Sequence, residues 1–479
     1  MRSSALQKLL DRQKQNKFGD YIASDRWPEL LHLINSRSAK FDDILTPLIQ
    51  NHKIQDFSMY VATQEPVPSI LQILIQLIPN VPDINSFGEL FKKLVLGYPQ
   101  YQTQVIEQLL VRSFLITDSM IFAETIIEIL KNAQHLSSLI SSAIIKYFPQ
   151  TQSPPQIQVR YLKNTLAICS ASDNINVTVM GRIFQHLVAL DCELMIMQST
   201  NNVAEIDEDV ADILGTQLQM FMEFLTNITS ETFALLIQLF DLYLLDLPKA
   251  SVVQYLLYYT SSLSQSNAET FIGFLLAKLI NTDVGQRSRS NAVLYLQSLT
   301  VRANYIDDDF ALTIMDYVAN YSNCYSNHIQ NEIPDQYKIN VQTHSIYYYS
   351  VQCISYIFCW RWKNWSKRNI DPNKRWNLSH LLCNEMHAID VIDKNISEMI
   401  KTYDFLNINN SMLVIDRISA WYPFDPCVLD TITPFVESSY INWSNEPVID
   451  DDADDIDTLL DNELSRAYRR RDIYPPFKL

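Results

Sequence analysis

The sequence contains very little glycine, with seven residues in a chain of 479, less than a quarter of the usual share. Glycine allows the positive-φ turns of hairpins and the close approach of backbone N–H groups to a phosphate. No G-x-G pair and no G-K-S or G-K-T triplet occurs. A Rossmann fingerprint and a P-loop are therefore excluded by residue type, and the composition favours long helices joined by short polar corners.

Positive charge is also in short supply. The 37 lysines and arginines face 54 aspartates and glutamates, which gives a net charge of −17. A surface this acidic repels phosphate backbones at long range. We therefore expect no direct binding to nucleic acid and a preference for basic patches on a protein partner.

Cysteines with metal-ligand or redox spacing are absent. The seven cysteines are odd in number and none is spaced C-x-x-C, which predicts a reducing compartment. Residues 1–10 lack the apolar core of a secretory signal peptide. The uncharged stretch Ser345–Trp360 carries four tyrosines and is too short and too polar for a membrane span, so we predict a buried helix there.

Catalytic and metal-binding patterns are missing as well. The eight histidines show no H-x-x-x-H or H-E-x-x-H spacing, and no serine lies in a G-x-S-x-G turn. Residues Asp451–Asp455 match the D-D-x-x-D of isoprenoid synthases, but they lie among further aspartates in a polar tail without a second acidic motif. We predict no enzyme activity, no metal and no cofactor.

Helical periodicity recurs along the chain. In residues 101–116, Tyr101, Val105, Ile106, Leu109 and Leu110 share one helix face. Helices of similar length follow at about 35–45 residues per pair, which is typical of irregular HEAT or armadillo repeats. We predict an all-α, HEAT/armadillo-like solenoid over residues 1–445, with a globular helical bundle as the alternative.

Two segments interrupt this pattern. Residues 200–212 are polar and acidic, which predicts a loop between helices. Residues 446–479 contain an acidic run followed by Arg469–Arg471 and a proline pair, and they are predicted to form a solvated, largely disordered tail.

Tryptophan and basic residues are concentrated between Trp360 and Trp376. Such a mixture can bind single-stranded nucleic acid by stacking and charge. It can equally be a helix end whose aromatic rings pack inward while the cations meet water or an acidic partner. The net charge of −17 favours packing or a protein contact.

Four serines, Ser137, Ser138, Ser141 and Ser142, are spaced to share one face of a helix. Leu136, Leu139, Ile140, Ala143 and Ile144 are predicted to face the core. An ordinary exposed face would carry more Glu and Lys, which have better helix propensity. The serines therefore indicate either a neutral docking patch, which phosphorylation would disrupt by adding negative charge, or a plain polar face.

Several segments resemble the RNA polymerase I-specific transcription initiation factor family (the TIF-IA type). Tyr161–Cys169 is similar to its "Y-x-R-N-L-L-x-I" helix, and Arg182–Glu193 to its "L-x-x-L-D-V-E-I" helix, which leads into an acidic loop. After the acidic segment of this chain, Ile213–Leu225 resembles the next helix, "L-x-x-L-x-L-L-F-E-Y".

Three later segments follow in the same order as in the family. Arg289–Ile306 resembles "R-x-x-A-V-x-Y-L-A-S-F-x-A-R-A-x-F-I", Tyr349–Arg361 resembles "Y-x-x-x-Q-A-V-L-Y-I-F-C-F-R", and Tyr422–Pro426 resembles "F-P-F-D-P". The spacing of Ala292, Leu296, Leu299 and Ala303 predicts a core stripe. Arg289 and Arg302 are then left for polar contacts.

The resemblance implies a non-enzymatic factor that binds RNA polymerase I near its stalk and recruits it to a promoter-bound core factor for ribosomal RNA synthesis. It also implies a nuclear and nucleolar location, regulation by phosphorylation, and scope for self-association. The acidic loop is shorter than is common in the family, which weakens the case for regulation through the loop. A general HEAT-repeat adaptor for transport or complex assembly is the alternative.

Overall fold

The computed structural model describes residues 18, 21–36, 41–64, 68–83, 87–200, 208–332, 339–408, 417–418, 421–424 and 429–441. These residues form an all-α structure without a β-strand, apart from an isolated bridge between Ala303 and Tyr440. None of the described helices is long and apolar enough to cross a membrane. The all-α prediction is therefore confirmed.

The chain divides into two compact units, Met1–Ile183 and Phe184–Leu479, each of which is described by itself. The division falls inside one continuous helix, α11 (Asp173–Thr200). It differs from the single repeat domain predicted over residues 1–445. Residues 201–207 of the predicted acidic loop and the predicted tail 446–479 lie outside the described residues.

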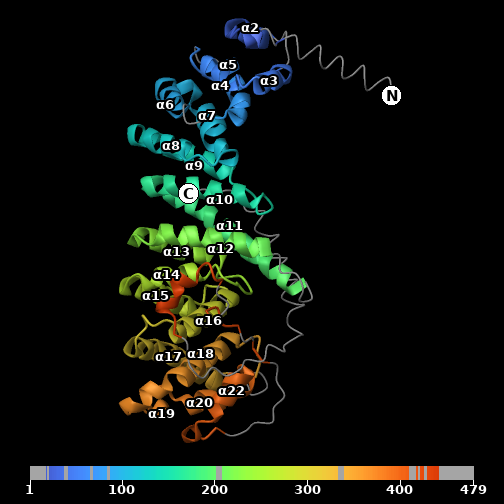
Figure 1. Ribbon diagram of the computed structural model, residues 1–479. Helices are drawn as coiled ribbons and strands as arrows, with labels where there is room; N and C mark the ends of the chain where they lie inside the picture. The colour runs from blue at the N-terminus through green and yellow to red at the C-terminus, as the bar shows by residue number, and fades with distance from the viewer. Residues whose placement is uncertain are drawn as a thin grey trace, which may run out of the picture. The chain divides into compact units, whose positions relative to one another are not determined.

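Helices of the first unit pack on helices close to them in the chain, as expected for stacked helical repeats (Figure 1). Its helices are α2 (Trp27–Asn35), α3 (Phe41–Gln50), α4 (Ile54–Ala62), α5 (Pro68–Leu77), α6 (Gly88–Gly97), α7 (Gln102–Val105), α8 (Ile121–Asn132), α9 (Ser137–Lys146) and α10 (Pro155–Ala171). A π-helix, η4 (Ile106–Val111), and a 3-10 helix, η5 (Arg112–Leu115), continue α7 directly.

The second unit follows the same rule. Its longer helices after α11 are α12 (Glu208–Leu225), α13 (Ser230–Tyr243), α14 (Tyr255–Ser262), α15 (Gln265–Ile280), α16 (Gln286–Arg302), α17 (Asp308–Glu332) and α18 (Ser345–Trp365). Shorter helices complete it: η8 (Ser366–Arg368), α19 (Pro372–Trp376), α20 (Leu378–Cys383), α21 (Ala388–Val391), α22 (Lys394–Lys401), η9 (Asp404–Leu406), α23 (Thr433–Val436) and η10 (Glu437–Ser439).

Two layers can be distinguished in the second unit. Helices α13, α15, α17 and α19 contact one another in succession and each has an exposed side. Helices α14, α16 and α18 lie behind them, and α16 is buried on every side from Ser290 to Arg302. The predicted buried helix at Ser345–Trp360 is confirmed as most of α18, which is buried from Ser350 to Arg361.

Residues 429–441 lie against α14 and the C-terminal end of α16 (Figure 1). Asn304 N donates to Ser439 O at 2.9 Å, and Ile441 N donates to Arg302 O at 2.7 Å. The Tyr258 hydroxyl on α14 donates to Ser439 O at 2.8 Å. Residues distant in sequence thus cover the side of α14 and α16 that a surface helix would expose to water. Neither helix therefore needs a polar side.

The side-chain amide of Gln297 in α16 is buried and lacks hydrogen bonds to the described residues. The residue is 0% exposed, and within the described part of the chain neither its amide oxygen nor its amide nitrogen has a hydrogen-bond partner. An unpaired buried amide costs about 1–3 kcal/mol. We expect Gln297→Met to raise the free energy of unfolding by about 1 kcal/mol in urea titrations; a loss of stability would mean that the amide is satisfied in solution.

Candidate functional site

The predicted serine helix is present as α9, but its polar face is narrower than predicted. Ser138 and Ser142 are exposed and Ser137 is half-buried, whereas Ser141 is 5% exposed. The Ser141 hydroxyl donates to Ser137 O at 2.9 Å, so its burial leaves no hydroxyl unpaired. The prediction that all four serines share an exposed face is therefore wrong for Ser141.

The opposite side of α9 forms the core as predicted for four of the five apolar residues. Leu136, Ile140, Ala143 and Ile144 are buried, and Leu139 is half-buried. The Tyr161 hydroxyl on α10 donates to Ile144 O at 2.7 Å. The apolar side and this hydrogen bond fix which way the exposed serines point.

Helix α9 packs against the π-helix η4. Lys146 Nζ lies 2.6 Å from Glu107 Oε2, and Gln108 Nε2 donates to the Tyr147 hydroxyl at 2.6 Å. Short π-helical segments are rare and occur often at functional sites. The exposed pair Ser138 and Ser142 thus lies on a helix that is tied to an unusual backbone segment of the first unit.

Arg289 and Arg302, which the sequence left for polar contacts, are used inside the second unit. Arg289 Nε donates to Leu279 O at 3.0 Å and its NH2 group donates to the Tyr321 hydroxyl at 3.0 Å, which joins α15 to α17. Arg302 is only 2% exposed, and its guanidinium lies 5.5 Å from the Trp360 ring centre and 5.6 Å from that of Tyr440. Their contacts within this unit are structural, and Arg302 is not available at the surface.

The predicted core stripe beside them is confirmed. Ala292, Leu296, Leu299 and Ala303 are all 0% exposed, although Ala303 is the residue that ends α16 rather than part of its last turn. Helix α16 packs between α15 and α18.

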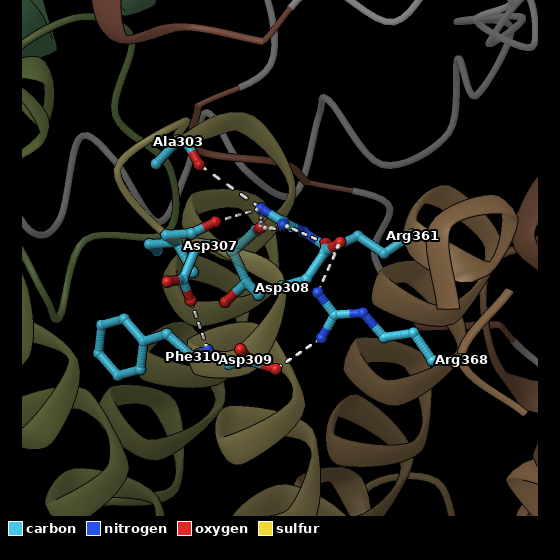
Figure 2. A network of polar contacts seen from close by, with 9 residues as sticks. Ala303, Asp307, Asp308, Asp309, Phe310, Arg361 and Arg368 are labelled. Carbon is cyan, nitrogen blue, oxygen red and sulfur yellow. Dashed lines mark hydrogen bonds and ion pairs between the residues drawn. The ribbon is translucent and has the colours of Figure 1, made fainter. Parts of the chain in front are cut away.

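Arg361 on α18 is the centre of a buried polar network (Figure 2). Its guanidinium donates to Thr300 O at 2.6 and 2.9 Å and to Ile306 O at 2.9 Å, and it pairs with Asp308 Oδ1 at 3.2 Å. Burial lowers the pKa of Arg361, and the charge of Asp308 opposes that effect. The network joins the C-terminal end of α16 to the N-terminal end of α17, where helix dipoles favour a cation and an anion respectively.

The aromatic and basic segment Trp360–Trp376 is largely used in packing. Trp360, Trp365 and Trp376 are buried. Arg375 forms a two-pronged pair with Asp316 at 2.7 and 2.8 Å, and the Trp376 indole donates to the same carboxylate at 2.8 Å. Of the two interpretations left open by the sequence, these contacts favour inward packing over a nucleic-acid platform.

Asp191, in the motif segment Arg182–Glu193, has a structural role that the sequence did not reveal. It is 1% exposed on α11, and its carboxylate accepts backbone N–H groups from Ser251, Val252 and Val253 at 3.1–3.3 Å. Burial raises its pKa to about 6, and these hydrogen bonds counteract the rise. Asp191 therefore anchors the loop that leads into α14.

Among the described residues, no group of three or more His, Cys, Asp or Glu side chains is placed to hold a metal ion. The D-D-x-x-D run Asp451–Asp455 lies outside the described part of the chain. The surface of α9 remains the candidate site that the sequence singled out.

Comparisons with known proteins agree over most of the chain. A family model described as RNA polymerase I specific transcription initiation factor RRN3 matches residues 81–227 and 223–402. The RNA polymerase I-specific transcription initiation factor rrn3 of Schizosaccharomyces pombe is 22% identical over 398 residues, which cover 67% of this chain and 66% of the relative. The factor RRN3 of Mus musculus is 22% identical over 248 residues, which cover 46% of this chain and 38% of the relative.

A solved structure shows the same fold. The crystal structure of RNA polymerase I transcription initiation factor Rrn3 superposes with a TM-score of 0.66 at 15% sequence identity, covering 91% of this chain and 98% of that one. The resemblance inferred from six short segments is thus confirmed by a family model that matches well over half of the chain. The chain belongs to the RNA polymerase I specific transcription initiation factor RRN3 family.

Proposed function

We propose that the chain is a non-enzymatic initiation factor that binds RNA polymerase I and recruits it to a promoter-bound core factor for ribosomal RNA synthesis. The match of the family model over residues 81–402 carries this proposal. Stacked helices that present extended surfaces, without a metal cluster among the described residues, suit a protein that works by binding. The proposed place of action is the nucleus, and within it the nucleolus.

Direct nucleic-acid binding is not part of the proposed function. The net charge is −17, and three of the basic residues near Trp360 already pair with Asp308, Asp309 or Asp316. Promoter contact would then come through the partner proteins.

The proposal is tested by identifying what the full chain binds. We expect the affinity-tagged chain to co-purify with the two largest RNA polymerase I subunits and with core-factor subunits, identified by mass spectrometry against an untagged control. Recovery of transport receptors or other assemblies in place of polymerase I would instead indicate a general helical-repeat adaptor.

We further propose that the exposed serines of α9 belong to the polymerase contact and act as an off switch when phosphorylated. Burial of Ser141 restricts this proposal to Ser138 and Ser142, with Ser137 at the edge. Two phosphate groups would add up to four negative charges to a chain whose net charge is already −17. Like charges that face each other across an interface cost several kcal/mol.

The double variant Ser138→Asp, Ser142→Asp should lose polymerase I binding by tenfold or more while folding normally. Both side chains are exposed, so the free energy of unfolding should change by less than about 1 kcal/mol. Surface plasmon resonance with purified polymerase I would measure the loss, and urea titration the stability.

Two further variants separate the switch from simple disruption. Ser138→Ala, Ser142→Ala should bind polymerase almost as the parent chain does. Ser141→Asp places a carboxylate at a 5%-exposed position, so it should destabilise the first unit rather than act only on binding. Normal polymerase binding by the double aspartate variant would make α9 an ordinary polar surface.

A further inference from the structure

Three helices of the second unit present their exposed sides next to one another. Helix α13 contacts α15, and α15 contacts α17, as the row of these helices in Figure 1 shows. Lys278 Nζ lies 2.7 Å from Asp241 Oδ2, which places the C-terminal ends of α13 and α15 together. Arg289, through Leu279 O and the Tyr321 hydroxyl, ties the end of α15 to the middle of α17.

The combined exposed side of these helices carries almost no charge. The exposed acids Glu231, Glu269 and Asp309 lie within the first five residues of these helices; beyond those residues, and up to Asn331 in α17, none of the exposed side chains that the structure describes is an Asp, Glu, Lys or Arg. We call the exposed residues beyond these starts the low-charge face: Gln238, Leu242, Thr270, Gly273, Ala277, Ile280, Thr313, Tyr317, Asn320, Cys324, Asn327, His328 and Asn331. The half-exposed charges beside them are paired, Asp241 with Lys278 and Asp316 with Arg375.

Exposed helix sides in the first unit do carry charged residues, so the lack of charge is not a general property of the chain. Beyond the first five residues of the helix, the exposed residues of α8 still include Glu128 and Lys131, and those of α6 include Lys93. Outer helices of this protein can therefore carry the usual mixture of charges. Depletion of charge is the compositional mark of the centre of a protein–protein interface.

Exposed apolar side chains gather on the same face. Ile280 and Tyr317 are each 63% exposed and Leu242 is 54% exposed, the three highest values for large hydrophobic residues in the described chain. One lies on each of the three helices. Large exposed apolar groups in a setting depleted of charge are typical of a binding surface, and we take these three side chains as its anchors.

The size of the low-charge face suits a specific contact. The face runs over residues 270–280 of α15, about 16 Å at 1.5 Å per residue, and three helices packed about 10 Å apart span about 30 Å. The face then offers on the order of 500 Å², more than half of the roughly 800 Å² that each partner contributes to a standard interface.

We propose that the low-charge face of α13, α15 and α17 is the docking surface for the promoter-bound core factor, through an uncharged, apolar protein surface of that partner. The assignment rests on the proposed function, in which one chain must bind polymerase and core factor together and therefore needs two separate surfaces. The serine helix α9 is proposed for the polymerase. A nucleic-acid occupant is disfavoured because the face offers no lysine or arginine to a phosphate.

The test compares two charge-introducing variants of the full chain. Leu242→Glu, Ile280→Glu places two carboxylates on the low-charge face. The matched control, Leu96→Glu, Val177→Glu, changes exposed apolar residues of the first unit, which are 40% and 46% exposed. Binding is measured separately to purified polymerase I and to purified core factor assembled on a promoter fragment.

We expect the Leu242/Ile280 variant to bind core factor at least tenfold more weakly, with polymerase binding and the urea midpoint unchanged. The control should bind both partners like the parent. Equal core-factor binding by the parent and the Leu242/Ile280 variant would overturn the assignment and leave the proposed function intact. Failure of the parent chain to bind either partner would overturn the proposed function and this assignment with it.

Two exposed cysteines provide an independent readout. Cys324 lies on the low-charge face, and Cys383 is exposed on α20, outside it. Promoter-bound core factor should slow maleimide labelling of Cys324 and leave Cys383 unchanged, as followed by peptide mass spectrometry. Unchanged labelling of Cys324 in the complex would contradict the proposal. Protection that instead rises with the concentration of the chain alone would assign the face to a second copy.

Discussion

Replacing Arg361 by methionine should lower the free energy of unfolding of the second unit by about 3–5 kcal/mol. The side chain is 4% exposed, and its guanidinium serves the carbonyls of Thr300 and Ile306 as well as the carboxylate of Asp308. Methionine fills a similar volume but donates no hydrogen bond. The loss therefore measures the carbonyls of Thr300 and Ile306 left without this donor and the carboxylate of Asp308 left with only the longer pair to Arg368, and urea titration would record it.

Arg368 offers a matched control on the same carboxylates. It pairs with Asp308 at 3.7 Å and contacts Asp309, but it is 43% exposed (Figure 2). Exposed ion pairs contribute about 0–1 kcal/mol, so Arg368→Met should change the unfolding free energy by no more than about 1 kcal/mol. Equal effects of the two substitutions would mean that the buried network does not hold α16, α17 and α18 together.

The second large effect is expected at Leu296. The side chain is 0% exposed in α16, between α15 and α18, so Leu296→Ala removes apolar burial and leaves a cavity. Such substitutions cost about 2–5 kcal/mol. Leu242→Ala, at a 54%-exposed leucine of α13, is the matched control and should cost less than about 0.5 kcal/mol. A change below about 0.5 kcal/mol at Leu296 would mean that the core stripe of α16 is exposed.

The sequence was most informative where periodicity and composition acted together. The apolar spacing of Ala292, Leu296 and Leu299 and the long uncharged run Ser345–Trp360 correctly predicted α16 and α18 as core helices. It was least informative about polar residues inside the core. Arg302 and Arg361 are buried because carbonyls, rings and carboxylates distant in sequence surround them, and local spacing carries no record of those partners.

The burial of Ser141 could not be predicted from the sequence either. Ser141 follows the buried Ile140 directly and lies one turn before the buried Ile144, at the border of the core side of α9. Because a serine hydroxyl can bond to the carbonyl four residues earlier, here Ser137 O, burial is tolerated and residue type does not reveal it. The division of the chain at Ile183 was also hidden, since it falls inside the unbroken helix α11.

The low-charge face was missed for a related reason. Its residues come from α13, α15 and α17, and none of these helices stands out alone. The unusual property is that three neighbouring exposed sides lack charge together, which requires knowing which helices are neighbours. A count of charged residues per predicted helix face would have been the available signal.

Initiation at a ribosomal RNA promoter should require this chain to bring polymerase I to the promoter-bound core factor. Reconstituted transcription from a ribosomal RNA promoter, with purified polymerase I and core factor, tests it directly. We predict that correctly initiated transcripts require the added chain, and that the Ser138→Asp, Ser142→Asp variant does not support them. Equal amounts of correctly initiated transcript with and without the chain would contradict the central claim.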